Sequence, residues 1–491
     1  MNESRMEKEP EMLSAEAARQ ILGISRTTMH RLLSGGELHG SKVGGQWRFR
    51  RADLDAYVER APHDIAAAAL PALEAEIRWW TPAPESGAEA ATSEAKIGAL
   101  AEAILALAMR REASDIHIEP RADGALIRLR DDGVLDDVRT LPLPLLAPLV
   151  AHFKKLGALN VAETRAPQHG RANLSLGGAD WVWYLATLPV GGNETMTIQL
   201  TPHPPMASMR AELGDLGLPN EELKRVEAWL GQPMGLILVV GPQESGKNTT
   251  LTALMSRVTK PECKVMAVEE NLDVVVPGAV QVEANGATGL SVAEALHAFF
   301  RHDPDVIVAG AVKEREELEL LLRGAHNGHL VLAAMDAASF SDVITKLDEM
   351  EIEPFVLSSA LLGVVAQRLV RRLCRDCTID DAPDAALVER ARGLASAGGY
   401  KMPEKVNWKR GAGCAKCRGT GARGRIALYE VVSNAGEIAA AITRRAPKDE
   451  LETLARASGA PDLFAAGVRA AVEGQTSLST LFVSLAHTLR R

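Results

Sequence analysis

Short apolar runs set between helical patterns mark the second half of the chain. They lie at 236–240, 264–268, 306–309 and 330–334. Strands buried on both faces read as continuous apolar runs, whereas half-buried strands alternate apolar and polar residues. The order of runs and helical patterns, which begins near Leu213, therefore predicts an α/β fold with a mainly parallel sheet covered by helices.

The first sixty residues have a different pattern, which predicts a helix-turn-helix. Ser14 is placed to cap one helix and Ser25 a second, with Gly23 allowing a tight turn between them. The second helix would carry Arg26, Thr27, Thr28, His30 and Arg31.

A hairpin is predicted after this pair of helices, with its turn at Gly44-Gly45 in the stretch 42–50. Alternation along the second strand puts Trp47 and Phe49 on one face. Arg48 and Arg50 fall on the other face, where they would be free to meet phosphate groups.

Composition suggests the domain boundaries. Residues 12–60 form the winged helix-turn-helix unit, and 61–95, rich in Ala, Pro and Glu, reads as a linker. The segment 96–205 mixes short strands with one helix, and 213–491 carries the parallel-sheet pattern. About three domains are also what a chain of 491 residues leads us to expect.

The overall charge and hydropathy exclude some classes of protein. A formal net charge of −9 argues against a chain that coats nucleic acid or anionic membrane over its whole surface. The apolar runs at 236–240 and 141–150 are far shorter than the roughly 20 residues of a spanning helix, and the start lacks the apolar core of a signal peptide. We expect a cytoplasmic protein that is not itself transmembrane.

Four of the five cysteines form two CxxC pairs, Cys374 with Cys377 and Cys414 with Cys417. Four thiolates in two such knuckles suit tetrahedral Zn²⁺ with no open coordination position, so the predicted zinc is structural. A disulfide pair is the alternative, which a reducing cytosol disfavours. Cys263 is assigned no role.

A glycine-rich loop follows the run at 236–240 and precedes a helical pattern. Backbone N–H groups at such a helix start hold phosphates, and Lys247 would reach the outer ones. The next side chain should be a hydroxyl that ligates Mg²⁺, but here it is Asn248. The candidate nucleotide-binding residues are Gly241, Ser245, Gly246, Lys247, Asn248 and Thr249.

These motifs, with several others, resemble the bacterial type II secretion and type IV pilus-assembly ATPases over about 80% of the chain. The resemblance extends to SDIHIEP at 114–120, HDPDVIVAG at 302–310, GHLVL at 328–332 and AQRLVRRLC at 366–374.

The resemblance implies a RecA-like P-loop motor domain at 213–491 that uses ATP with Mg²⁺ and contains a tetracysteine zinc insert at 374–417. It also implies that the α+β subdomain at 96–205 packs on a neighbouring subunit and supplies arginines to its nucleotide. Tyr184 and Gln199 stand where the family has arginine, which weakens that role.

Other departures from the family pattern fall on the chemistry. Ala311 replaces the acid that polarises the attacking water, Asp336 replaces the histidine of the His box, and His297 replaces an arginine. Asn248 replaces the Mg²⁺ hydroxyl, and Glu244 stands where a glycine is usual, which adds a carboxylate near the phosphates and a backbone angle that suits glycine. Little or no hydrolysis is expected.

Glu269 matches a family glutamate that orients a water, and is the one candidate catalytic residue. The alternative is a working enzyme with rearranged roles, in which Glu244, Glu269 or Glu270 serves as the base.

The first sixty residues resemble the excisionase-type, MerR-like winged helix-turn-helix family, in which the second helix enters the major groove. The alternative is a small adaptor that keeps the fold without binding DNA. The candidate DNA contacts are Arg26, Thr27, Thr28, Arg31, Arg48 and Arg50.

Together these features predict a secretion- or pilus-ATPase subunit with impaired hydrolysis that acts as a scaffold or regulatory component. It would form a homo-hexamer or a mixed ring with an intact paralogue, beside the platform proteins of the inner membrane and peripheral to that membrane. The alternatives are an active hexameric ATPase and a DNA-binding regulator that uses the motor fold to oligomerise.

Overall fold

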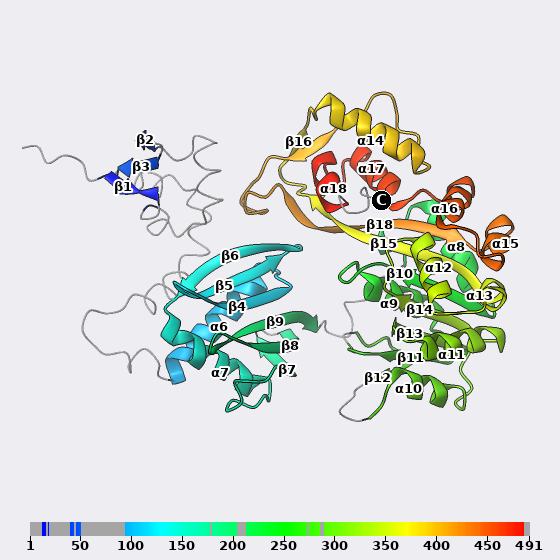
Figure 1. The fold of residues 1–491 in the computed structure, drawn as a ribbon, viewed down its shortest axis with the longest axis horizontal. Helices are drawn as coiled ribbons and strands as arrows, with labels where there is room; N and C mark the ends of the chain where they lie inside the picture. Colours follow the sequence, from blue (N-terminus) through cyan, green and yellow to red (C-terminus); the bar gives the residue numbers. More distant parts are fainter. Residues whose placement is uncertain are drawn as a thin grey trace, which may run out of the picture. The chain divides into compact units, whose positions relative to one another are not determined.

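The computed structural model divides the chain into two compact units, Met1–Pro202 and His203–Arg491 (Figure 1). Each unit is described by itself. The residues that the structure describes are 12–15, 18, 40–43, 46–50, 94–176, 179–203, 213–272, 274–284 and 289–485.

A small antiparallel sheet lies near the N-terminus, in the strand order β1-β3-β2. Its strands are β1 (Met12–Ser14), β2 (Ser41–Val43) and β3 (Gln46–Arg50). The pairing of Val43 with Gln46 confirms the predicted hairpin, and Phe49 is fully buried. Residues 61–93 of the predicted linker at 61–95 lie outside the described residues. So do the predicted second helix with Arg26, Thr27, Thr28 and Arg31 and the side chains of Arg48 and Arg50.

A six-stranded antiparallel sheet with two helices is formed by the described residues between 94 and 203. The sheet has the order β6-β5-β4-β9-β8-β7, and residues such as Ile116 and Ile118 alternate into its core. Its elements are α6 (Glu94–Arg110), β4 (Asp115–Arg121), β5 (Gly124–Asp131), β6 (Val134–Leu141), η1 (Leu143–Leu145), α7 (Leu146–Leu156), β7 (Gln168–Leu176), β8 (Ala179–Val190) and β9 (Asn193–His203).

The prediction of one helix in this segment is wrong, because both α6 and α7 are present. Pro148 does not prevent α7, since it lies in the first turn, where a backbone N–H has no partner within the helix. Lys154 of α7 is fully buried and pairs with Glu194 of β9 at 2.5 Å, which anchors the helix to the sheet.

The second unit is built on a seven-stranded sheet in the order β12-β11-β13-β14-β10-β15-β18. Six strands run parallel and β18 is antiparallel to β15, which confirms the predicted mainly parallel sheet. The strands are β10 (Gly235–Val240), β11 (Val265–Glu269), β12 (Ala279–Glu283), β13 (Val306–Val312), β14 (Leu330–Met335), β15 (Leu361–Leu373) and β18 (Ala422–Ser433).

Helices cover both faces of this sheet, which is why its central strands read as continuous apolar runs (Figure 1). Leu236 and Leu238 of β10 pack into one core, and Ile237 and Val239 pack into the other. The first core takes side chains from α10 (Val292–Phe299), α11 (Arg315–His326), α12 (Phe340–Glu349), α13 (Pro354–Ala360), α15 (Glu437–Thr443) and α16 (Lys448–Ala457). The second takes them from η2 (Leu213–Leu216), α8 (Asn220–Leu230) and α9 (Lys247–Val258).

A further core joins the cysteine-containing insert to the C-terminal helices; it includes Ala391, Ala395, Trp408 and Phe464. The elements of this region are β16 (Thr378–Asp380), α14 (Ala385–Ala397), β17 (Lys409–Gly411), α17 (Leu463–Val472) and α18 (Leu478–Ser484).

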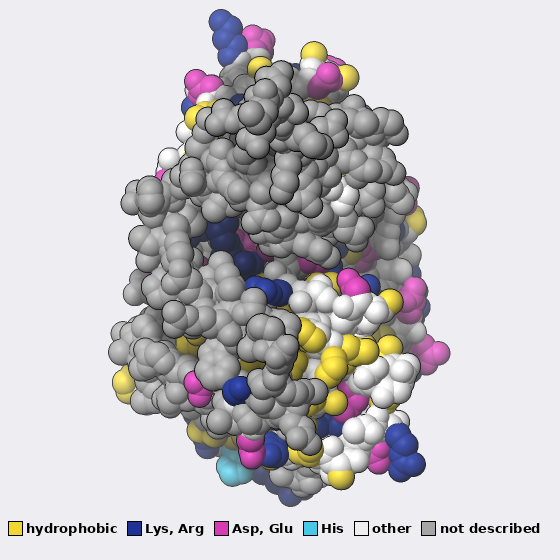
Figure 2. Space-filling model, turned by 90° about the vertical axis from the view of Figure 1, so that its left-hand side faces the viewer, with side chains coloured by type: hydrophobic (Ala, Val, Ile, Leu, Met, Phe, Trp, Pro, Cys, Tyr) yellow, Lys and Arg dark blue, Asp and Glu magenta, His cyan; other side chains and the backbone are white. Residues whose placement is uncertain are grey.

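The described helices include none with the length and apolarity of a membrane span. On the face drawn in Figure 2, the described side chains of both charges lie close together around a group of hydrophobic side chains.

Candidate nucleotide site and zinc centre

The glycine-rich loop runs from the end of the buried strand β10 to the start of α9. Gly246 has a φ of 87°, in the left-handed region that favours glycine. A Cβ on Gly241 would lie 2.6 Å from the carbonyl oxygen of Gln367, so the close approach of loop and strand also requires glycine. The loop therefore has the strand-loop-helix geometry that the sequence predicted.

Glu244 also lies in the left-handed region, with a φ of 61°. This is the backbone angle that suits glycine, as expected for a position that is usually glycine in such loops. A residue with a Cβ is disfavoured there by roughly 1–2 kcal/mol. The loop keeps its shape with some backbone strain at the position that also introduces a carboxylate.

Lys247 is held by three oxygen atoms of the protein. Its Nζ donates to the carbonyl oxygens of Gly241 at 3.0 Å and Pro242 at 2.7 Å. The same Nζ lies 2.8 Å from Oδ1 of Asp336, at the end of the neighbouring strand β14. Three partners match the three donors of an ammonium group, so an incoming phosphate must displace at least one of them.

A buried glutamine fastens the loop to β15. The hydroxyl of Thr250 donates to Oε1 of Gln367 at 2.8 Å, and Nε2 of Gln367 donates to the carbonyl oxygen of Ser245 at 2.8 Å. The Ser245 hydroxyl is buried without a hydrogen-bond partner, while Asn248 and Thr249 are exposed. The first turn of α9 therefore offers a hydroxyl and an amide side chain to a ligand.

Glu269 occupies the end of β11 and is 8% exposed. Its Oε1 accepts a hydrogen bond from Nε2 of Gln281 at 2.9 Å. A Cβ on Gly310 would come within 2.9 Å of the Glu269 side chain, so the two strands meet closely here. Ala311, the residue after Gly310, has no acidic side chain. Lys313 forms an ion pair with Glu270 at 2.5 Å. Glu269 is held in a fixed orientation, as a residue that positions water requires.

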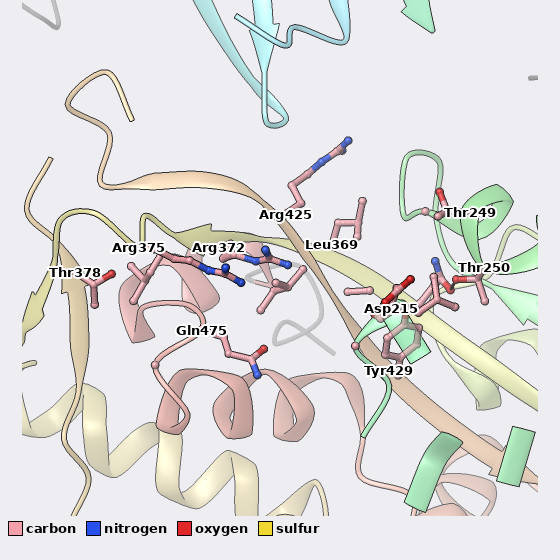
Figure 3. A pocket seen from close by; sticks show the side chains of 18 residues that line it. Asp215, Thr249, Thr250, Leu369, Arg372, Arg375, Thr378, Arg425, Tyr429 and Gln475 are labelled. Carbon is pink, nitrogen blue, oxygen red and sulfur yellow. Dashed lines mark hydrogen bonds between the residues drawn. The ribbon is translucent and has the colours of Figure 1, made fainter. Parts of the chain in front are cut away.

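A cavity of ≈ 530 Å³ opens beside the loop (Figure 3). Gly246, Thr249 and Thr250 line one end of it. Tyr429 closes one side, donating from its hydroxyl to the carbonyl oxygen of Leu216 at 3.1 Å, and burial raises the pKa of this phenol to about 12. The volume is in the range typical of small-molecule sites.

The four paired cysteines come together in the insert. Sγ of Cys374 lies 3.8 Å from that of Cys414, and Sγ of Cys417 lies 3.7 Å from those of Cys377 and Cys414. Four sulfurs placed tetrahedrally at ~2.3 Å from one Zn²⁺ ion are about 3.8 Å apart. The donor set therefore fits zinc, and its spacing is too wide for a disulfide.

The surrounding groups also prepare the sulfurs for a metal. Backbone N–H groups of Cys414 and Gly421 donate to Sγ of Cys417 at 3.1 Å and 3.2 Å. Burial raises the pKa of this thiol, but these N–H groups, together with hydrogen bonds to the thiols of Cys377 and Cys414, outweigh burial and lower the pKa to about 6. Burial raises the pKa of Cys377 to about 12. A bound Zn²⁺ ion would supply the positive charge that four thiolates need together.

Two other positions that depart from the family pattern, His297 and Tyr184, have partners of their own. His297 Nε2 lies 3.7 Å from Oε1 of Glu316, and Arg171 lies over the ring of Tyr184, 5.8 Å from its centroid. Neither contact involves the phosphate-binding loop.

Comparison with known families agrees with this architecture. Residues 90–483 match the family described as "Type II/IV secretion system protein". The chain belongs to this family. Residues 12–62 match a helix-turn-helix domain, so this member of the secretion family carries a second module ahead of it.

Three curated relatives show the extent of the match. The type IV pilus assembly ATPase PilB of Thermus thermophilus is 36% identical over 371 residues, which cover 76% of this chain but 41% of PilB. The type II secretion system protein HxcR of Pseudomonas aeruginosa is 33% identical over 438 residues, 88% of each chain. The type II secretion system protein E of Pectobacterium carotovorum is 36% identical over 72% of this chain and 69% of its own length.

Solved structures support the fold alone, since their identity to this chain is low. The Legionella pneumophila ATPase DotB superposes with a TM-score of 0.57 at 15% identity, covering 79% of this chain and 96% of DotB. The pilus retraction motor PilT gives 0.51 at 22% identity, covering 78% of this chain and 96% of PilT.

Sequence reasoning missed three features of the site. It marked Asp336 as a departure from the family but did not predict its ion pair with Lys247. It did not predict the Gln367 link or the arginine residues that line the cavity. Arg372 and Gln367 lie in the family segment at 366–374, and that segment was the available signal.

Proposed function

We propose that this secretion-family subunit binds ATP with Mg²⁺ weakly, hydrolyses little of it, and acts as a scaffold or regulatory component of a type II secretion or type IV pilus-like machine. The observation that carries the proposal is the ion pair between Lys247 and Asp336. The lysine that should meet the outer phosphates is already neutralised by an acid in the place of a family histidine.

The size of this effect follows from the exposure of the two groups. Asp336 is 63% exposed and Lys247 is 13% exposed, so solvent screens the pair. Pairs of this kind contribute about 0–1 kcal/mol, which corresponds to up to about fivefold in nucleotide affinity. Two other residues add to this weakening of nucleotide binding. The carboxylate of Glu244 repels the phosphates, and the amide of Asn248 is a poorer Mg²⁺ ligand than a hydroxyl at this position.

Loss of hydrolysis has a separate cause. A general base contributes about 10²–10⁴-fold in rate, and Ala311 has no group that could serve as one. Glu269 remains to orient a water, but its Oε1 also accepts a hydrogen bond from Gln281.

Relatives named for type II secretion and type IV pilus assembly support a place in such a machine. We propose that the chain forms a homo-hexamer there, or a mixed ring with an intact paralogue, next to inner-membrane platform proteins. The four cysteines would hold a structural Zn²⁺ ion that shapes the insert. The proposed domains are 12–60, 96–205 and 213–491, joined by the linker at 61–95.

Two other functions have an observation in their favour. The complete loop geometry and the fixed Glu269 favour an active ATPase that powers assembly. The helix-turn-helix match favours a regulator that contacts DNA through Arg26, Thr27, Thr28, Arg31, Arg48 and Arg50.

Steady-state ATP hydrolysis by the zinc-loaded chain tests the proposal. Wild-type turnover is expected to match that of the Lys247→Ala variant, because the chain already lacks the acid at 311. Combining Ala311→Glu with Asp336→His is expected to raise turnover, by at most the ~10²–10⁴-fold that a base contributes.

Asp336→Asn provides the matched control for nucleotide binding, since it removes the charge and keeps the size. It is expected to tighten ATP binding by up to about fivefold without restoring turnover. Wild-type turnover well above that of Lys247→Ala would refute the proposal and favour the active ATPase.

A further inference from the structure

One end of the cavity beside the phosphate-binding loop is lined by arginine residues that do not belong to the loop; we call it the basic end. Arg372, Arg375 and Arg425 line the cavity together with Gln475 (Figure 3). Arg372 and Arg375 extend into the same space, toward which Gln475 points from the opposite side, while Arg425 points away from them. None of the three guanidinium groups has an ion pair or hydrogen bond with a described residue.

Positive charge is also concentrated around this end of the cavity. Arg371 and Arg425 are register partners on the antiparallel strands β15 and β18, and like charges directly opposite each other are destabilising. The Nε of Arg371 is buried without a partner. The nearby acid Asp376 is already engaged, since it pairs with Lys416 at 2.5 Å. Arg371 does not line the cavity, so the pair of Arg371 and Arg425 adds to the positive charge around the basic end without being part of the proposed site.

The basic end is separate from the phosphate-binding loop. Gln367 of β15 contacts the loop at Ser245, and Arg372 lies five positions further along the same strand. At a rise of ~3.3 Å per residue, the two positions are about 16 Å apart. The backbone of Arg372 is therefore well separated from the N–H groups of the loop, which makes the basic end a distinct part of the cavity.

We propose that Arg372 and Arg375 bind a second phosphate group, at a site distinct from the phosphate-binding loop but in the same cavity. Guanidinium groups form paired hydrogen bonds with phosphate, and Arg is the side chain best suited to this. The phosphate would come either from a free polyphosphate or from the distal end of a dinucleotide. This inference does not depend on whether ATP is hydrolysed.

Calorimetric titration of the zinc-loaded full chain with inorganic pyrophosphate tests the site. In a Lys247→Ala background, pyrophosphate binding is expected to persist, because the arginines are intact. Adding Arg372→Gln and Arg375→Gln is expected to weaken it about tenfold or more.

The control for charge is the pair Arg301→Gln and Arg323→Gln, which removes the same number of charges elsewhere in the second unit. An equal loss in this control, or no loss in the Arg372/Arg375 variant, would overturn the site. Zinc content checks that each variant is folded. If the double variant is not folded, the single variant Arg375→Gln, at an exposed position, replaces it in the titration.

A second set of titrations decides the source of the phosphate. With Lys247 intact, the binding of ATP and of diadenosine tetraphosphate is compared between the wild type and the arginine variants. If the arginine variants weaken only the dinucleotide, the ligand spans both ends of the cavity. If they weaken only pyrophosphate, the ligand is a free polyphosphate. If they weaken ATP and the dinucleotide equally, the arginines contact the nucleoside, and the assignment to a second phosphate is wrong.

Discussion

Glu430 has a pKa well above that of an ordinary glutamate. Its side chain is fully buried between β18 and the start of α12, where Oε2 accepts a hydrogen bond from the N–H of Phe340 at 3.3 Å. Burial, joined by the nearby acids Asp462, Glu452 and Asp342, raises its pKa to about 8. This carboxyl group therefore carries a proton at neutral pH in the folded protein.

Glu430 is expected to make stability fall as pH rises. Between the ordinary glutamate pKa near 4.5 and a folded pKa of about 8, the folded chain holds a proton that the unfolded chain has lost. The free energy of unfolding should decline across this window, by at most about 1.4 kcal/mol per pH unit from this group.

Urea unfolding of the wild type and Glu430→Gln at pH 6 and pH 8.5 measures this decline. The amide keeps the acceptor for Phe340 and cannot ionise, so the variant should lose less stability between the two pH values. The same loss in both proteins would show that Glu430 is not the group responsible. Asp462, whose pKa burial also raises, is present in both and cancels in the comparison.

At the scale of elements, we expect the cysteine insert to need a metal as well as its packed core. Its strands β16 and β17 form an isolated antiparallel pair, and two-stranded ribbons are marginal alone. Packing of α14 against α17 supports one side of the insert, and the cysteine knuckles support the other.

Removal of one zinc ligand is expected to release the metal and loosen these strands. Cys414→Ser should lower bound zinc from one equivalent to near none and speed amide exchange in β16 and β17, because binding energy is folding energy at such sites. Metal analysis with hydrogen exchange measures both effects.

Cys263→Ser is the matched control, since Cys263 lies apart from the four paired cysteines and packs against a different core. This variant should keep its zinc. Full zinc content in Cys414→Ser would contradict the four-thiolate site.

The whole molecule joins two modules that match two different families. The secretion-family region covers 90–483 and the helix-turn-helix region covers 12–62, so most of the chain belongs to one or the other. A net charge of −9 disfavours nucleic acid over the surface as a whole, and any DNA contact must therefore come from a local basic face.

Replacing Arg48 and Arg50 by Gln is expected to weaken DNA retention and reduce its dependence on salt. Each lost phosphate contact lowers the slope of log affinity against log salt by about 0.9, so two contacts lower it by about 1.8. Binding to duplex DNA at several salt concentrations measures the slope, with Arg301→Gln and Arg323→Gln as the charge control. If the wild type does not bind DNA, or the slope is unchanged in the variant, the module acts as an adaptor.

The sequence by itself determined the parts of this protein that are encoded locally. Apolar runs with helical spacing predicted the parallel sheet, because strand burial and helix amphipathicity leave periodic signals over a few residues. The phosphate-binding loop, the two cysteine pairs and the missing acid at Ala311 were readable for the same reason. The helix α7 was missed because it begins in an apolar run that contains Pro148, and this run hides the helical spacing of its apolar residues.

Only the tertiary structure decided which distant residues meet. Gln367 contacts a loop residue 122 positions away, and Asp336 reaches Lys247 because β14 lies next to β10 in the sheet. Arg372 shares a cavity with Thr249 because β15 runs past the start of α9. Sheet order and register set these contacts, and a linear pattern of polar and apolar residues does not record which strands become neighbours.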